Sequence, residues 1–469
     1  MLFATNAQSY STTGCALKSF VYLVPFVFNK KEIMTTFNSS LTFAKQLDQQ
    51  DPLASYREQF VINDPDLIYL DGNSLGRMTK ASAERAKQVV DEEWGNDLIR
   101  GWNKGWWEAP ARIGDKIGQL IGAAPGQTIV SDSTSINLFK LAMAALTYQP
   151  HKKRIITDTL NFPSDLYILQ GCVQLLSPSP NGRGVRGEGA SHEILRISSL
   201  DNDLTPDLAA LESAINEDTA LVTLSHVLFK SGYIYDMQHI TDLAHRQGAL
   251  VLWDLSHSVG SIPIELDACN ADLAIGCTYK YLNGGPGAPA FLYVNKAIQE
   301  KISSPIWGWW GQNKPFDFGL DFEPAPGAQR FLVGTQPMIS LLTIESSLEP
   351  FLKVGMEAIR AKSILMTDYA SFLTDSLLAP FGFSLGSPRD SAQRGSHISI
   401  RHADGYRINR ALIEEMNVIP DFRAPDNIRL GFAPLYTSFT EIWQGFDRIK
   451  RVMAERRFGK YPKQKLMVT

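Results

Sequence analysis

An aspartate and a lysine follow two apolar stretches that lie close together in the sequence. Residues 249–253 are apolar and lead into Asp254, and residues 273–277 are mostly apolar and are soon followed by Lys280. Short apolar runs of this kind are typical of buried strands in a parallel sheet. Because ligands bind beyond the carboxyl ends of such strands, we expect Asp254 and Lys280 to share one site at that edge.

A lysine and a carboxylate at one sheet edge are the groups that pyridoxal phosphate (PLP) requires. The amine binds this cofactor covalently, and the carboxylate pairs with its pyridinium nitrogen and keeps it protonated. Gly284, Gly285 and Gly287 follow the lysine and permit a tight turn beside a ligand. Either charged residue alone would predict only a surface contact, but their order and the Gly-rich turn together predict a PLP site.

Other predicted strand ends carry residues that suit a phosphorylated aromatic ring. Residues 131–135 precede a helix and are rich in hydroxyls, which bind anions at helix N-termini but also cap ordinary helices. Phe162 follows a strand and could stack on the ring, with Asp165 close behind. Arg429 lies inside an apolar strand and needs an anion, which would be either a structural partner or a substrate carboxylate.

Two tryptophan-rich segments are further candidates. Residues 101–107 and 307–311 each contain three tryptophans. Clusters of this kind usually belong to a core or an interface. Because several of these tryptophans flank glycines in predicted loops, an aromatic substrate pocket fits equally well.

The elements that must position these residues alternate between strand and helix from about residue 80. Apolar runs predict strands at 128–130, 154–157, 221–224, 249–253, 273–277 and 290–294, and helical spacing predicts helices at 81–94, 136–146 and 237–244. This alternation predicts an α/β fold with a mostly parallel central sheet flanked by helices. After Pro337, long helical periodicity, strands at 397–401 and 428–432 and a final helix at 441–451 predict a smaller α+β domain.

The chain of 469 residues is long enough for two domains. We expect a non-core extension at 1–40, in which Met34 is an alternative start, and a segment at 41–79 that packs with the small domain. A large cofactor-binding domain at 80–336 and the small C-terminal domain at 337–469 complete the division. The Gly- and Pro-rich residues 178–189 are expected to form an exposed excursion.

Composition excludes several classes of function. A formal charge of −4 gives no reason to expect nucleic acid or an acidic membrane surface, and no GxGxxG motif follows an early strand, as it would in a dehydrogenase. The apolar residues 20–28 are too few to span a bilayer. Four cysteines without zinc-site spacing indicate neither a disulfide framework nor a metal site, and favour a cytoplasmic protein.

Several segments together resemble the kynureninase family, PLP-dependent hydrolases of fold-type I in the aminotransferase class V group. The segments are Leu70–Gly76, Ser133–Leu138, Phe162–Asp165, Asp254–His257, Tyr279–Gly285, Asn427–Arg429 and Pro434–Tyr436. The resemblance covers roughly residues 45–460. The Asp254-to-Lys280 segment alone would identify only the wider class.

The resemblance implies a role for each matching position. Lys280 would bind PLP covalently, Asp254 would contact the pyridinium nitrogen, and Tyr279 would carry a proton. The implied cofactor contacts are Thr134, Ser135, Phe162, Asp165, Ser225, Asp254, His257, Tyr279, Lys280, Trp309 and Thr335.

The resemblance also implies substrate contacts and a shared active site. Arg429 would hold the substrate α-carboxylate, and Trp102 would line the aromatic pocket. Trp309 and Thr335 would reach a second subunit's site in a homodimer, although some relatives have asparagine at the position of Thr335.

The implied reaction cleaves the Cβ–Cγ bond of L-kynurenine or 3-hydroxykynurenine, giving anthranilate or 3-hydroxyanthranilate and L-alanine. It belongs to tryptophan degradation by the kynurenine pathway and to NAD biosynthesis. Three alternatives stay open: a cysteine desulfurase-like enzyme, a class V aminotransferase and a non-catalytic PLP-fold binding protein. The first of these uses a cysteine late in the chain, but no cysteine follows Cys277.

Overall fold

The computed structural model describes residues 37–177 and 192–463. Residues 1–36 of the predicted extension and the whole of the predicted excursion at 178–189 lie outside the described residues. No helix within the described ranges is long and apolar enough to cross a membrane.

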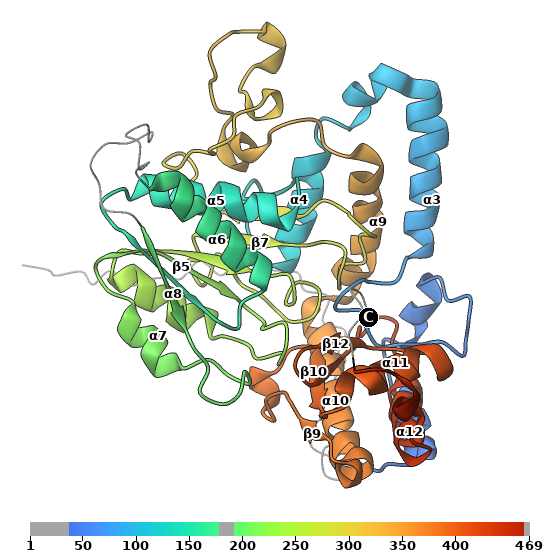
Figure 1. Ribbon diagram of the computed structural model, residues 1–469. Helices are drawn as coiled ribbons and strands as arrows, with labels where there is room; N and C mark the ends of the chain where they lie inside the picture. Colours follow the sequence, from blue (N-terminus) through green and yellow to red (C-terminus); the bar gives the residue numbers. More distant parts are fainter. Residues whose placement is uncertain (1–36, 178–191, 464–469) are drawn as a thin grey trace, which may run out of the picture. The chain divides into compact units, whose positions relative to one another are not determined.

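A seven-stranded sheet forms the centre of the fold (Figure 1). Its strands are β2 (Thr128–Val130), β3 (Arg154–Asp158), β4 (Glu193–Ile197), β5 (Thr219–Ser225), β6 (Leu250–Asp254), β7 (Leu273–Gly276) and β8 (Phe291–Val294). The strand order is β2-β8-β7-β6-β5-β3-β4, and β8 alone runs in the direction opposite to the other six strands. The predicted mostly parallel sheet is therefore confirmed. The unpredicted strand β4 lies at one edge, where partly exposed residues obscure the apolar pattern.

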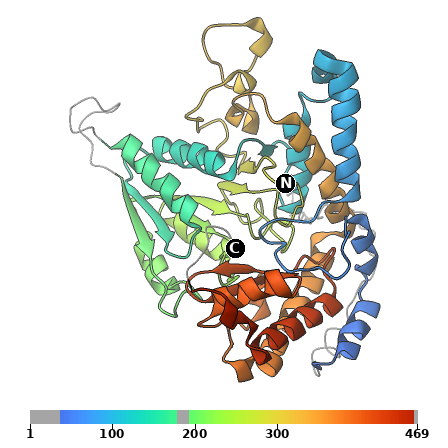
Figure 2. The same ribbon diagram turned by 45° about the vertical axis from the view of Figure 1, so that its right-hand side comes forward.

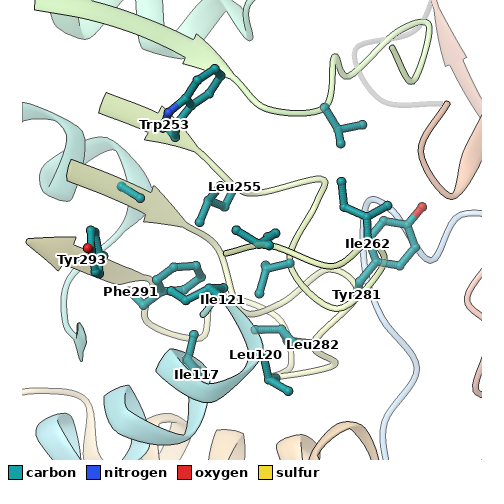
Figure 3. Packing of buried hydrophobic residues seen from close by; sticks show 14 of the residues in the cluster. Ile117, Leu120, Ile121, Trp253, Leu255, Ile262, Tyr281, Leu282, Phe291 and Tyr293 are labelled. Carbon is teal, nitrogen blue, oxygen red and sulfur yellow. The ribbon is translucent and has the colours of Figure 1, made fainter. Parts of the chain in front are cut away.

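Helices cover both faces of this sheet because successive strand residues point to opposite sides. The helices are α4 (Ala109–Leu120), α5 (Thr134–Tyr148), α6 (Pro163–Leu176), α7 (Leu208–Ala214) and α8 (Met237–Arg246). Farther from the sheet, α9 (Met338–Val354) packs on α4, and α3 (Lys80–Gln88) packs on α9. Leu250 and Leu252 belong to the core under α5 and α6. Val251 and Trp253 belong to the opposite core, with α4 and α8. In Figure 3, Trp253 and its neighbours from the sheet lie in that second core with Ile117 of α4.

A second, antiparallel sheet follows in the C-terminal part. It contains β9 (Ser384–Leu385), β10 (His397–Arg401), β12 (Asp421–Arg423) and β13 (Asn427–Gly431), in the order β12-β13-β10-β9. The helices that accompany it are α10 (Met356–Leu373), α11 (Gly405–Glu415) and α12 (Phe439–Ala454). The strands predicted at 397–401 and 428–432 are present, the second shifted by one residue.

The N-terminal segment contacts this C-terminal part. β1 (Ile68–Tyr69) pairs in parallel with β11 (Val418–Ile419). The carboxylate of Asp48, in α2 (Leu41–Gln49), accepts hydrogen bonds from the N–H groups of Phe439 and Thr440 at the start of α12. Figure 2 shows the blue helix α2 beside the red α12.

Shorter helical segments complete the fold. They are the 3-10 turns η1 (Ala54–Gln59), η3 (Leu98–Lys104), η4 (Trp309–Gly311), η5 (Pro315–Asp317), η6 (Gly327–Phe331), η8 (Ala379–Phe381), η9 (Ser391–Gln393) and η10 (Arg457–Lys460), and the π-helices η2 (Val89–Asp97) and η7 (Thr374–Leu378). The helix predicted at 81–94 is thus α3 continued by η2.

Candidate active site

A cavity of about 210 Å³ lies at the carboxyl ends of β6 and β7. It is lined by Ser74, Thr134, Ser135, Phe162, Ser164, Asp165, Asp254, Ser256, His257, Tyr279, Lys280, Arg423 and Arg429. Most of the site residues predicted from the sequence therefore meet in one place. Ser225, Trp102, Trp309 and Thr335 do not line this cavity.

Asp254 and Lys280 reach the cavity from neighbouring strands, as predicted. Asp254 is the last residue of β6, and its Oδ1 accepts hydrogen bonds from the N–H (2.9 Å) and Oγ (2.6 Å) of Ser256. These two bonds fix the carboxylate. Lys280 follows β7, and its Nζ lies 5.9 Å from the ring centroid of Phe162. The chain leaves through Gly285 and Gly287, which have φ angles of +92° and +70° that favour glycine.

His257 lies between the cationic groups of the cavity. Its Nε2 is 3.4 Å from Lys280 Nζ and 3.5 Å from an Arg429 nitrogen. Burial, together with these two cations, lowers the pKa of His257 well below its ordinary value. The imidazole is therefore neutral near pH 7, and its Nε2 can serve as a hydrogen-bond acceptor for either cation.

Hydroxyls and helix N–H groups line another part of the cavity, at the start of α5. Thr134 and Ser135 form the first turn of α5, and Ser135 Oγ is 3.1 Å from Ser164 Oγ. The preceding loop is held by the buried Lys140, whose Nζ donates to Asp132 Oδ2 and to the carbonyl of Phe331, both at 2.7 Å. A helix N-terminus of this kind suits a phosphate.

Phe162 gives the cavity an aromatic wall. It precedes Pro163 at the start of α6, and 39% of its surface is exposed. Ser225 donates to Asn161 Oδ1, which also accepts from the Phe162 N–H at 3.1 Å. Ser225 thus supports the turn that carries Phe162.

Asp165 adds a buried carboxyl group to the same wall. Burial, and then the neighbouring Asp254, raise the pKa of Asp165 well above its ordinary value. Asp165 is therefore more readily protonated than an ordinary aspartate.

Arg429 borders the cavity from the C-terminal sheet. Its side chain is 1% exposed and forms an ion pair with Asp421. It also donates to Ser74 Oγ (2.7 Å) and to the carbonyl of Phe229 (2.8 Å). Both sequence-based alternatives for this arginine thus have a physical basis, because it has a structural partner and it lines the cavity.

Sequence reasoning missed four lining residues. They are Ser74, Ser164, Ser256 and Arg423. The three serines lie in segments that carried the family resemblance, Leu70–Gly76, Phe162–Asp165 and Asp254–His257, but no role was assigned to them. Arg423 could have been predicted. It lies two residues after Asp421 and shortly before Arg429, and alternate residues of a strand point to the same face.

The two tryptophan segments come together away from the lining residues. The ring centroids of Trp102 and Trp309 are 5.9 Å apart, and Trp107 stacks on Trp310 at 5.2 Å. Thr335 is exposed. The substrate and intersubunit roles of Trp102, Trp309 and Thr335 stay predictions.

The residues present fit PLP. The cavity combines an amine, a buried carboxylate, an aromatic face and a hydroxyl-rich helix N-terminus, and these match the aldehyde, the pyridinium nitrogen, the ring and the phosphate. In the described part of the chain, no group of three histidine, cysteine, aspartate or glutamate side chains could hold a metal ion.

Solved structures of PLP enzymes share the fold. The apo cysteine desulfurase of Thermococcus onnurineus NA1 matches with a TM-score of 0.69 at 16% identity, covering 88% of this chain and 98% of that one. The Escherichia coli cysteine desulfurase CsdA matches with a TM-score of 0.70 at 17% identity, covering 86% of this chain and 98% of that one. At such low identity these matches establish the fold, and they confirm the predicted fold class.

Sequence comparisons are more specific. Residues 359–449 match the model of the kynureninase C-terminal domain, and residues 197–272 match the DegT/DnrJ/EryC1/StrS aminotransferase family. A kynureninase of Burkholderia pseudomallei (strain 1106a) is 43% identical over 419 residues, covering 87% of this chain and 94% of that protein. A kynureninase of Pseudomonas fluorescens is 43% identical over 425 residues, covering 90% and 96%. With identity this high over nearly the full length, the chain belongs to the kynureninase family, whose enzymes depend on PLP.

Proposed function

We propose that this protein is a PLP-dependent hydrolase that cleaves the Cβ–Cγ bond of L-kynurenine, giving anthranilate and L-alanine, in tryptophan degradation and NAD biosynthesis. The observation that carries the proposal is one cavity that joins Lys280, Asp254 and Arg429. The first two residues suit the cofactor, and the third suits the carboxylate of an amino-acid substrate. The sequence identity with curated kynureninases supports kynurenine as the substrate.

Bound PLP supplies an electron sink next to the substrate's amino carbon. Asp254, which accepts two hydrogen bonds from Ser256, would pair with the pyridinium nitrogen and keep it protonated. Phe162 would cover the ring, and Thr134 and Ser135, at the start of α5, would hold the phosphate. These residues would hold the cofactor in the cavity that Lys280 lines.

Lys280 and Tyr279 move the protons. Lys280 Nζ would take the α-proton of the bound substrate and would return a proton to the same carbon before alanine leaves. The adjacent Cys277, together with burial, raises the pKa of Tyr279, so its hydroxyl stays protonated and acts as a donor. Water adds at the γ-carbonyl carbon, the Cβ–Cγ bond breaks, and Cβ gains a proton. The products are anthranilate and alanine.

A desulfurase function lacks its nucleophile in the described residues. Cys172 and Cys277 are buried, Cys269 is partly buried, and none of them lines the cavity. Burial also raises the pKa of the Cys277 thiol, which makes it a poor nucleophile. The free state of these cysteines supports a cytoplasmic location.

The test is direct. Purified protein with PLP is incubated with L-kynurenine and, in parallel, with 3-hydroxykynurenine, and product fluorescence gives the two rates. Borohydride reduction followed by peptide mapping should place a pyridoxyl group on Lys280. Lys280→Ala should lose the visible absorption band and the activity, whereas Lys116→Ala, on the surface of α4, should keep both. A pyridoxyl group on any other residue would refute the assignment.

We further propose a homodimer in which Trp309 and Thr335 complete the site of the second subunit. Support comes from the segment at 307–322, which projects from the rest of the fold in Figure 1 and exposes Phe318 (81%) and Leu320 (102%). Exposed apolar groups of this size mark interaction surfaces. Sedimentation should give the mass of a dimer. Replacing Phe318 and Leu320 by serine should shift the mass toward that of the monomer. A monomeric wild type that turns over kynurenine normally would exclude a shared site.

A further inference from the structure

Arg423 is a cavity residue without an assigned role. It ends β12 and lines the cavity, and its side chain is 35% exposed. Asp421 is two residues earlier and so shares its face of the strand. The antiparallel register with β13 sets Asp421 opposite Arg429. The sheet therefore places one carboxylate beside two guanidinium groups.

Arg429 has few donors left for a substrate. A guanidinium carries five N–H groups. One terminal nitrogen of Arg429 donates to Ser74 and Asp421, and the other donates to the Phe229 carbonyl and lies 3.5 Å from His257 Nε2. Only Nε has no hydrogen-bond partner among the described residues. Bidentate binding of a carboxylate takes two N–H groups, so Arg429 in this arrangement cannot provide it alone.

Arg423 has the donors that Arg429 lacks. One terminal nitrogen lies 2.8 Å from Asp421 Oδ2, the oxygen that also pairs with Arg429. Its Nε has no hydrogen-bond partner within the described ranges. Asp421 thus holds the two guanidinium groups at one point while Arg423 keeps N–H groups for a ligand.

We propose that Arg423 is a second carboxylate-binding residue of the active site, which with Arg429 holds the α-carboxylate of the substrate. This inference rests on the proposed function and deepens it. The charges favour Arg423 as an added cation, because Arg429 lies near two carboxylates, Asp421 and Asp71, whereas Arg423 forms its ion pair with Asp421. Asp421 is a positioning residue, since it acts through both arginines.

The test compares two ligands that differ only in the carboxylate. L-kynurenine and kynuramine, its decarboxylated analogue, are titrated into the holoenzyme, and binding is followed by the change in visible absorption. Removing one charge-assisted contact should weaken kynurenine binding about 10-fold to 100-fold in Arg423→Gln. Kynuramine binding should be unchanged. Arg423→Lys, which keeps the charge but loses the planar fork, should fall between wild type and Arg423→Gln.

A matched control excludes a general effect on the C-terminal sheet. Arg401 lies on β10 of the same sheet, pairs with Asp426 and does not line the cavity, so Arg401→Gln should bind both ligands like the wild type. In turnover, Arg423→Gln should raise KM with little change in kcat, because the carboxylate contact is made in both the ground and transition states.

The outcomes separate the two proposals. Equal weakening for kynurenine and kynuramine, or no weakening for kynurenine, overturns the role of Arg423. Wild-type protein that releases no anthranilate overturns the proposed function instead. The binding titration still decides the role of Arg423 in that case, because it needs no turnover.

Discussion

Gly76 lies directly against the backbone of Lys280. The Gly76 N–H donates to the carbonyl of the preceding Tyr279 at 2.8 Å. A β-carbon on Gly76 would lie 2.3 Å from the Lys280 carbonyl oxygen, a distance that no real contact allows. The N-terminal segment thus fixes the loop that carries Lys280, and only glycine permits this approach.

Gly76→Ala should therefore displace the Lys280 loop. We expect kcat to fall by about 100-fold, since a shift of about 1 Å in a reacting group has that effect. The visible band of the bound cofactor should weaken as well. Gly171→Ala is the matched control, because a β-carbon at this position in α6 meets nothing within 4 Å. Wild-type activity in Gly76→Ala would mean that the loop is not held by this contact.

Asp421 should be important for stability as well as for binding. Its side chain is 6% exposed, and Asp421→Ala would leave the buried Arg429 without its ionic partner. Breaking such a pair costs about 3–5 kcal/mol. Urea denaturation should show this loss. Asp421→Asn keeps an acceptor and should lose less. Equal losses of unfolding free energy in the two variants would mean that the negative charge of Asp421, and not its role as a hydrogen-bond acceptor, provides the stabilisation.

Asp71 should make stability depend on pH. Burial, and then repulsion from Asp421, raise the pKa of Asp71 from 3.8 to about 6. Because the native state binds this proton more tightly than the unfolded chain, the contribution favours folding at low pH and is lost as the pH rises through about 6.

Comparison with Asp71→Asn isolates this contribution. Relative to the variant, the wild type should lose about 1–3 kcal/mol of unfolding free energy between about pH 4 and about pH 7. Urea denaturation at both pH values measures it. If the unfolding free energies of the wild type and Asp71→Asn changed equally between the two pH values, Asp71 would already be ionised at the lower pH.

Lys140 should control retention of the cofactor. Its fully buried ammonium group joins the loop before α5 to Phe331. Lys140→Met removes that link, and we expect PLP to be lost faster on dialysis, while pyridoxal without the phosphate should be affected less. Lys152→Met is the control, because Lys152 also donates to backbone carbonyls but precedes the opposite, N-terminal end of β3. Equal loss of PLP in both variants would indicate general destabilisation.

The sequence alone determined the large sheet, the place of Asp254 and Lys280 at its edge, and the family. Apolar runs such as 249–253 are local signals, because a strand buried on both faces must be apolar at every position. Asp254 and Lys280 follow such runs directly, so their place at the sheet edge could be predicted. The family resemblance rested on short segments that local chemistry constrains.

Only the tertiary structure decided how distant segments complete the site. The register of β12 and β13 joins Asp421 to Arg429, and it brings Arg423 to the same cavity as Lys280. The approach of Gly76 to Lys280 joins positions about two hundred residues apart in the chain. Such contacts depend on strand register and on packing between elements, and neither leaves a periodic pattern in the residues concerned.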